Sequence, residues 1–301
     1  MLPIALVWAT LTRGRVVYDV HEYYSSYYVS KISAPKTIKT LASKMIDNFQ
    51  VWATKRIGGA NVVATAMSVK YINAGAPVSI SPNFPLRKAY DKATFANDME
   101  RFRRVIHTGT LSEPYGMKSI VDLAVLCEQR GYEIAIDLVR RFPNAHQEKL
   151  FVDYVNERGR PSNLRLIPAV TADKIPSLLT PYGIGLSMIT KTGQNDLAVP
   201  TKLYEYALMG LAIVGTDRTA QKEFVEEHAI GRLCGEQDIE GLADAIYLFS
   251  RAEQEQIVKI EEAAALAKTK LFWDDGPEAD VQRLLAEIFP PAQFDEAGNR
   301  G

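Results

Sequence analysis

The sequence predicts an α/β protein with two Rossmann-like domains, of which the N-terminal one is incomplete. The chain has 301 residues, 47% of them hydrophobic and 24% charged, which is enough apolar material and length for about two domains. In the second half, strand-like apolar runs alternate with helix-like runs, the pattern of a parallel sheet with crossover helices. The first part has only three predicted strands, which are few for a doubly wound domain.

The second half contains six predicted strand and helix units, enough for one doubly wound domain. Each strand is a short apolar run, and each helix has an apolar stripe at helical spacing. The predicted strands are Arg104–Thr108, Glu133–Leu138, Asn163–Ile167, Ile184–Ile189, Leu211–Gly215 and Gly231–Leu233. The predicted helices are Met117–Glu128, Ala145–Glu157, Asp173–Leu179, Thr201–Met209, Lys222–His228 and Ile239–Phe249.

The first part is shorter and leads into a connecting segment. Its predicted strands and helix are Val16–Val20, Ala60–Thr65, Val78–Ser81 and, between the last two strands, Ser68–Ile72. Residues 82–97 read as the connection between domains. We therefore predict a first domain over 1–86 and a second over 87–270, and a flexible tail over 290–301, which is rich in Pro, Gly and charge.

Composition excludes several classes of protein. The net charge of −1 creates no field that would attract nucleic acid, so we expect no nucleic-acid partner. Cys127 and Cys234 lie far apart in apolar surroundings, which predicts reduced thiols and a cytoplasmic location. The four histidines have no partners at metal-ligand spacing, so we predict no metal site. The apolar opening, residues 1–10, is too short to span a bilayer.

The segment 197–210, LAVPTKLYEYALMG, is the most informative stretch. Pro200 suits a helix start and Gly210 a helix end, and the next residues read as a buried strand. The N-terminus of such a helix would stabilise an anionic diphosphate, and Lys202 in the first turn adds a full charge. Glu205 lies about one turn further on the same side, where a carboxylate could accept hydrogen bonds from both ribose hydroxyls.

A second interpretation of this helix stays open on spacing alone. Lys202 and Glu205 could be a solvated pair on an exposed helix face, which is the commoner fate of such residues. In that case the helix would carry no ligand.

Several segments in order resemble one family of enzymes. The segment 197–210 resembles the donor-binding segment of the large retaining GT-B glycosyltransferase family, family four in the usual classification. DKIPSLLTPYGIGLSMI, residues 173–189, resembles the strand and helix that precede it, VYDVHE at 17–22 resembles an N-domain strand, and SPNFP at 81–85 resembles the entry to the interdomain linker. Phe272 and Trp273, followed by a helix over 278–288, resemble the terminal helix that crosses back to the N-domain, which we place within 271–289.

The resemblance implies a nucleotide-sugar donor site in the second domain. Its donor-binding residues would be Gly109, Thr110, Thr201, Lys202 and Glu205, with Lys202 at the phosphates and Glu205 at the ribose. It implies no cofactor, because the nucleoside-diphosphate sugar is itself the donor substrate, and no metal. The acceptor would be a glycan or a lipid-linked molecule, as in polysaccharide biosynthesis. Transfer would retain the anomeric configuration.

His21 follows the N-domain strand at an end where α/β proteins form ligand crevices. By the resemblance it would be the catalytic histidine that faces the donor sugar and the acceptor. The alternative is a capping or core histidine. Asp19 and Glu22 beside it are interpreted as structural carboxylates.

The sequence departs from the family pattern at three places. Many members have two glutamates eight positions apart, and here Leu197 stands at the earlier position. Thr110 and Tyr115 stand where many members have basic residues, so phosphate neutralisation would fall mainly on Lys202, with Lys118 as a candidate substitute. Members usually have further β/α units before the strand at 16–20, which suggests either a fragment with a late start or a reduced variant.

Residues 23–46 are a candidate for peripheral membrane contact. From Tyr23 to Ile46 there is no acidic residue, while the lysines 31, 36, 39 and 44 follow a group of tyrosines. Basic and aromatic residues together suit an interface with anionic lipid. An ordinary solvated loop and helix would have the same composition.

Two further functions remain open from the sequence. A degenerate or truncated family member could bind nucleotide without catalysis or depend on a partner subunit, and Leu197, Thr110 and the short first domain favour that interpretation. A sugar-nucleotide epimerase of the same architecture is the third hypothesis, although the segment around Lys202 resembles that class less. Transfer and hydrolysis assays would separate the first two, and product analysis would separate the third.

Overall fold

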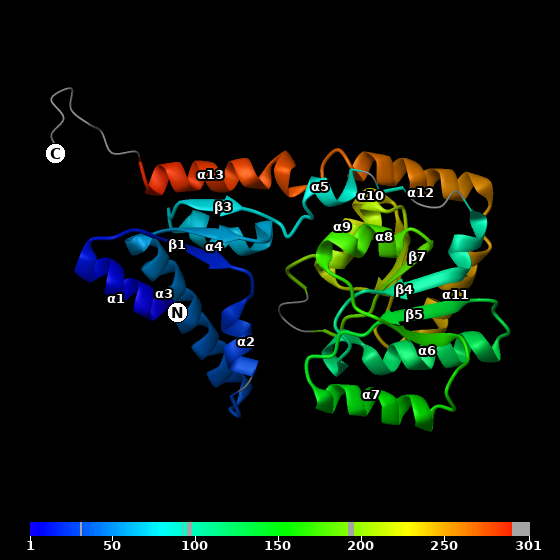
Figure 1. Ribbon diagram of the computed structural model, residues 1–301. Coiled ribbons are helices and arrows are strands. Elements are labelled where there is room, and N and C mark those ends of the chain that lie inside the picture. Colours follow the sequence, from blue (N-terminus) through cyan, green and yellow to red (C-terminus); the bar gives the residue numbers. More distant parts are fainter. Residues whose placement is uncertain (31, 92, 95–97, 192–195, 291–301) are drawn as a thin grey trace. The chain divides into compact units, whose positions relative to one another are not determined.

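The computed structural model describes residues 1–30, 32–91, 93–94, 98–191 and 196–290. The chain forms two compact units, one of Met1–Asn83 with Trp273–Gly301 and one of Phe84–Phe272 (Figure 1). Each unit contains a parallel sheet with helices, so the predicted α/β class with two Rossmann-like domains is confirmed. The predicted tail beyond residue 290 lies outside the described residues.

The second unit is built on a six-stranded parallel sheet in the order β6-β5-β4-β7-β8-β9. All six predicted strands are present: β4 (Arg104–His107), β5 (Ala135–Val139), β6 (Leu164–Ile167), β7 (Ile184–Ser187), β8 (Ala212–Thr216) and β9 (Gly231–Cys234). The order reverses between β4 and β7, where the loops after neighbouring strands run in opposite directions. Ligands of open α/β sheets bind at the carboxyl ends of the strands at such a point.

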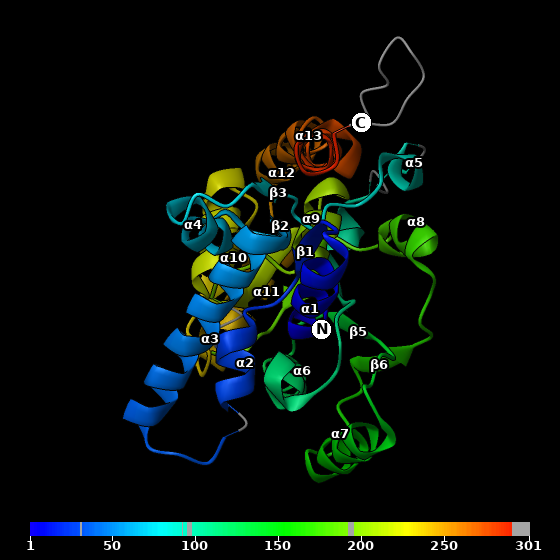
Figure 2. The same ribbon diagram turned by 90° about the vertical axis from the view of Figure 1, so that its left-hand side faces the viewer.

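Helices cover both faces of this sheet, which is why its strands are apolar at successive positions. Val105 and Val214 pack into one core with Leu123, whereas their neighbours Ile106 and Ile213 face the other. Figures 1 and 2 show α6 and α9 on opposite sides of the sheet. The helices are α5 (Arg87–Tyr90), α6 (Met117–Gln129), α7 (Ala145–Glu157), α8 (Ile175–Leu179), α9 (Thr201–Leu208), α10 (Thr219–His228), α11 (Ile239–Ser250) and α12 (Gln254–Ala267).

Two helix predictions in this unit need correction, and one helix was missed. The predicted helix 222–228 begins three residues earlier, at Thr219. The predicted helix 173–179 begins as a 3-10 turn, Ala172–Lys174, and becomes α-helical only at Ile175, next to Pro176. The helix α12 was not predicted at all. It follows α11 with no strand between them, so the alternation of strands and helices gave no sign of it.

The first unit has a three-stranded parallel sheet in the order β1-β2-β3. Its strands are β1 (Val16–Val20), β2 (Gly58–Val62) and β3 (Val78–Ile80), and its helices are α1 (Leu2–Thr12), α2 (Tyr24–Ser30), α3 (Lys36–Ile57), α4 (Thr65–Asn73) and α13 (Pro277–Ile288). The predicted strand 60–65 begins two residues and ends three residues too late, and its last residue, Thr65, already belongs to α4. Helix α13 packs against β3 and β2. In the described part of the chain, no helix has the length and apolar character that crossing a membrane requires.

Candidate functional site

The helix α9 forms where the sequence predicts it. Pro200 precedes the helix with a φ of −62°, and no side chain caps its first N–H groups. The helix ends at Leu208 with Met209 as its C-cap, and Gly210 turns the chain with a φ of +62° into β8. An uncapped start of this kind leaves backbone N–H groups available for an anion.

The loop after β4 docks onto this helix. The backbone N–H of Thr108 donates a hydrogen bond to Tyr206 Oη at 3.0 Å, and Thr108 Oγ1 lies 3.2 Å from the same oxygen. At Gly109 the backbone passes directly over buried groups, because a Cβ there would lie 3.0 Å from His107 Nε2 and 3.1 Å from Lys202 Nζ. The structure therefore brings Gly109 and Thr110 together with Lys202.

The side chain of Lys202 is buried, with a relative exposure of 7% for the residue. Among the residues that the structure describes, its Nζ makes no hydrogen bond or ion pair. Burial lowers the pKa of Lys202 to about 7, and the nearby Glu205 only partly opposes that effect. A buried amine without a partner is costly unless something neutralises it.

The two segments that meet at Gly109 and Lys202 also contain unpaired backbone donors. Within the described residues, the N–H groups of Gly109, Thr110, Thr201 and Lys202 have no hydrogen-bond acceptor. Thr201 itself is exposed at the first position of the helix. Unpaired donors from two elements beside a buried amine form a cradle for an anion.

Glu205 lies further along α9 and is half-buried. Burial raises the pKa of its carboxyl to about 7, and the positive charges of Arg141 and Lys202 oppose this shift. No hydrogen bond or ion pair to this carboxylate occurs in the described part of the chain. The interpretation of Lys202 and Glu205 as a solvated pair on an exposed face is wrong, because one is buried and the other half-buried.

The sequence analysis did not select His107, whose ring packs directly against Gly109. Its ring is fully buried, and Nδ1 donates to the Leu186 carbonyl at 3.1 Å. Burial and the charge of Lys202 hold the pKa of His107 well below its ordinary value. Hydrogen bonds to the backbones of Leu186 and Thr110 raise the pKa and only partly oppose this shift. His107 is therefore neutral, and its uncharged ring packs against the backbone at Gly109. No sequence signal marked it, because a buried histidine at a strand end is usually part of the core.

Arg141 was also missed, although its position two residues after β5 could have indicated it. Its carbonyl accepts a hydrogen bond from the Leu111 N–H at 2.8 Å, which holds it beside the loop that contains Gly109. Its guanidinium donates to the Val170 carbonyl at 3.1 Å and carries a charge that acts on Glu205. Lys118, the substitute cation proposed from the sequence, instead pairs with Glu113 at 2.8 Å.

His21 lies in the first unit, just after β1, and its side chain is about half-exposed at 52%. A core histidine is therefore excluded. Its Nε2 lies 2.8 Å from Asp19, whose other oxygen accepts a hydrogen bond from Asn61 at 2.9 Å. Ser79 and Ser81 in turn donate to Asn61. Side chains from three neighbouring strands thus fix the orientation of the histidine.

Nothing in the described residues groups three or more His, Cys, Asp or Glu side chains as a metal site would need. Cys127 and Cys234 are both buried and unpaired.

Comparison with known proteins identifies the type of fold. No protein-family profile matches the sequence, and no curated protein matches it. Among solved structures, HepE of Anabaena in complex with UDP-glucose has a TM-score of 0.72 at 17% identity, over 95% of this chain and 76% of HepE. A mutant of TarM from S. aureus, solved with UDP among its ligands, has a TM-score of 0.67 at 14% identity, over 91% and 51%. A glycosyltransferase of Rickettsia africae has a TM-score of 0.63 at 11% identity, over 96% and 81%. At these identities the similarity shows the fold, two Rossmann-like domains of the GT-B type.

Proposed function

We propose that this protein is a glycosyltransferase that takes a sugar from a nucleoside-diphosphate sugar. One observation carries the proposal: Gly109 lies directly against the buried, unpaired amine of Lys202 in the first turn of α9, and the N–H groups of Gly109, Thr110 and the helix start have no acceptor among the described residues. Several of the structurally similar proteins were solved with UDP or a UDP-sugar, which supports a ligand of this chemistry.

The site would act by stabilising the departing diphosphate. During transfer, the bond between the anomeric carbon and the diphosphate oxygen breaks while a bond to the acceptor oxygen forms. Negative charge then grows on the diphosphate, next to the N–H groups at Gly109 and α9 and the amine of Lys202. Because these groups are fixed before the reaction, little reorganisation opposes it.

Glu205 would hold the ribose of the donor. Its carboxylate has no protein partner among the described residues and lies along α9 from Lys202, at a spacing that suits the two ends of a nucleoside diphosphate. Arg141, which acts electrostatically on Glu205, would keep that carboxyl ionised and favour an anionic ligand.

The finer parts of the proposal concern the acceptor side. We include His21 as the group that contacts the donor sugar and acceptor, with retention at the anomeric carbon, no metal and a glycan or lipid-linked acceptor.

Peripheral membrane contact through 23–46 and a cytoplasmic location belong to the same proposal. On α3 the exposed Ile38, Leu41 and Met45 support that contact. Lys31 of the predicted basic group lies outside the described residues.

The direct test is calorimetric titration of the whole chain with UDP, GDP and ADP. We expect one diphosphate to bind with a Kd in the micromolar range and the Lys202→Met variant to lose most of that affinity. Absence of binding by all three would refute the proposed site. Product analysis with the matching nucleotide sugar then separates transfer from hydrolysis and from epimerisation.

A further inference from the structure

The second unit contains a cavity beside its edge strand β9. The cavity has a volume of about 420 Å³, which is within the size range of small-ligand sites. It lies between β9, the second half of α11 and the first turn of α12. Its lining residues are Arg232, Asp244, Tyr247, Leu248, Arg251, Glu253 and Gln256. This set shares no residue with the proposed donor site.

The cavity lies at the edge of the sheet opposite the donor site. Helix α11 follows β9 and runs back from the carboxyl ends of the strands toward their amino ends. Tyr132, which precedes β5, stacks on Tyr247 of α11 with ring centroids 4.3 Å apart, and this contact places Tyr247 at the amino edge. Gly109 and Lys202 follow β4 and begin α9 at the carboxyl edge. A ligand in the cavity is therefore remote from a donor nucleotide.

Three side chains offer unused hydrogen-bond donors to the cavity. Within the described residues Arg232 makes no ion pair or side-chain hydrogen bond, and the guanidinium of Arg251 contacts the ring of Tyr247, 5.6 Å from its centroid. Gln256 uses its side-chain oxygen, which accepts from the Glu253 N–H at 3.3 Å, while its amide N–H groups have no acceptor there. The cavity can therefore donate several hydrogen bonds to a ligand.

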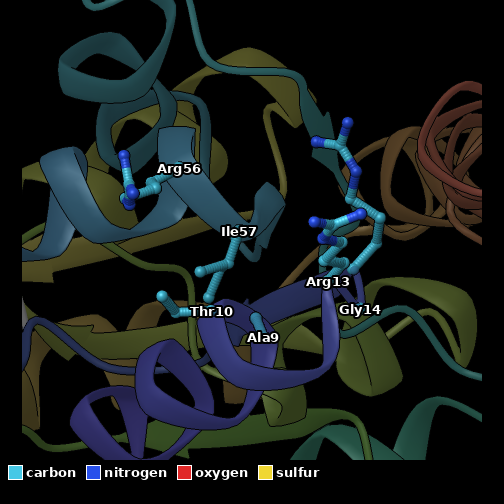
Figure 3. A pocket seen from close by; sticks show the side chains of 7 residues that line it. Ala9, Thr10, Arg13, Gly14, Arg56 and Ile57 are labelled. Atoms are coloured by element: carbon cyan, nitrogen blue, oxygen red, sulfur yellow. The ribbon is translucent and has the colours of Figure 1, made fainter.

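Carboxylates balance these arginines, which decides the kind of ligand. Asp244 and Glu253 line the same cavity, so two acidic side chains face two basic ones. Asp244 Oδ1 accepts from Arg130 at 2.6 Å, and its Oδ2 has no donor among the described residues. Figure 3 shows the contrasting cavity of the first unit, where Arg13 and Arg56 are not joined by any acidic lining residue that the structure describes. An all-basic lining suits an anion, whereas balanced donors and acceptors suit uncharged hydroxyl groups.

Tyr247 gives the cavity an apolar wall. One face of its ring is stacked on Tyr132, which fixes its orientation, and both Tyr247 and the neighbouring Leu248 are exposed. A sugar ring has C–H groups on its faces and hydroxyl groups around its rim. One face of the sugar can therefore pack on the wall while neighbouring hydroxyls bond to the planar donors of a guanidinium and to a carboxylate.

We propose that this cavity is a binding site for a neutral glycan chain. One sugar residue packs against Tyr247, and its hydroxyls accept hydrogen bonds from Arg232 and Arg251 and donate to Asp244. The site holds the glycan and makes or breaks no covalent bond. It does not depend on the donor site, so glycan binding can fail while UDP binding persists, and the reverse.

The test begins with the labelled full chain on an array of neutral and acidic oligosaccharides. We expect binding to neutral members, and calorimetry with one of these should show about 10- to 100-fold weaker binding by the Arg232→Gln/Arg251→Gln variant. The Arg13→Gln/Arg56→Gln variant undergoes the same change in net charge and should bind like the parent. Binding to no neutral member, or equal affinity losses in the two variants, would overturn the proposal.

The aromatic wall is tested by a pair of substitutions at one position. Tyr247→Leu keeps an apolar side chain without a flat ring, and we expect about tenfold weaker glycan binding with unchanged UDP affinity. Tyr247→Phe keeps the ring and should bind like the parent. Unchanged glycan binding by Tyr247→Leu would overturn the role assigned to the wall. Circular dichroism of each variant should match that of the parent chain.

Two measurements on the parent chain need no variant. The bound oligosaccharide should slow hydrogen exchange in peptides from α11 and the start of α12, and protection confined to the first unit would overturn the proposal. Saturating UDP should leave the affinity for the oligosaccharide unchanged, because the two sites lie at opposite edges of the sheet. Competition by UDP would place the glycan at the donor site instead, and tighter binding of acidic members of the array would indicate an anion site.

Discussion

Replacing Lys202 by methionine should make the protein more stable and less able to bind its donor. The two side chains have similar length, so packing is retained while the charge is removed. Lys202 is buried without a partner in the described residues, which means that the folded chain holds an amine whose charged form is disfavoured. Such an arrangement is useful only if an anionic ligand compensates for it.

The expected gain follows from the two pKa values. The pKa of Lys202 falls from 10.5 to about 7 on folding. At pH 7 this difference corresponds to a penalty of roughly 4 kcal/mol, since each pKa unit is worth about 1.4 kcal/mol. Because the unfolded chain binds the extra proton, the penalty is complete below pH 7 and disappears as the pH rises toward 10.5. Allowing for relaxation, we expect the variant to gain about 2–4 kcal/mol at pH 7.

Hydrogen exchange of peptides from α9 and β8 in increasing urea measures this gain within the second unit. Calorimetry with the diphosphate that binds the parent chain measures the loss, which should be roughly 10- to 100-fold for a charge-assisted hydrogen bond. Lys118→Met is the matched control, because Lys118 is exposed and pairs with Glu113. It should change stability by less than about 0.5 kcal/mol and leave binding unchanged.

One result would refute this reasoning. If Lys202→Met were less stable than the parent and bound the diphosphate equally well, Lys202 would be a structural residue. The anion would then have to bind elsewhere.

Four further predictions concern the same residues and the histidine network. Diphosphate binding should take up a proton on Lys202, so affinity should fall as the pH rises from 7 to 9, and calorimetry in buffers of different ionisation enthalpy should count that proton; an affinity independent of pH would argue against it. Glu205→Gln should weaken diphosphate binding about tenfold by disturbing its bonds to the ribose, whereas the affinity for pyrophosphate should not change. Arg141→Gln should raise the pKa of Glu205 and shift the acid limb of the binding profile to higher pH, and an unmoved profile would count against that contact. Asn61→Ala should lower the transfer rate about tenfold with unchanged diphosphate affinity, because it releases Asp19 and so His21, and a change in affinity instead would contradict this assignment.

The sheet of the second unit was predictable because its strands are buried on both faces. Runs such as 211–215 are apolar at successive positions, and Pro200 and Gly210 mark the ends of the helix before that run. The helices α1 and α12 were not predicted from the sequence, for different reasons. Helix α1 is apolar on both faces and so lacks the polar side of an amphipathic pattern, and α12 interrupts the alternation of strand and helix.

The site was predictable only in part. Gly109, Lys202 and Glu205 were selected from sequence, but the burial of Lys202 depends on the loop after β4, which lies far away in the chain. The support by His107 and the charge of Arg141 depend in the same way on how neighbouring strands end. Local patterns describe what one segment can do, whereas burial is set by the segments that fold over it.

The placement of the aromatic side chains has a practical consequence for spectroscopy. The tryptophans at positions 8, 52 and 273 all belong to the unit that contains α1, α3 and the stretch leading to α13. Indole fluorescence therefore reports the unfolding of that unit and gives no signal from the unit Phe84–Phe272. Comparing its urea transition with that of the far-ultraviolet circular dichroism signal should reveal whether the halves denature together or in sequence.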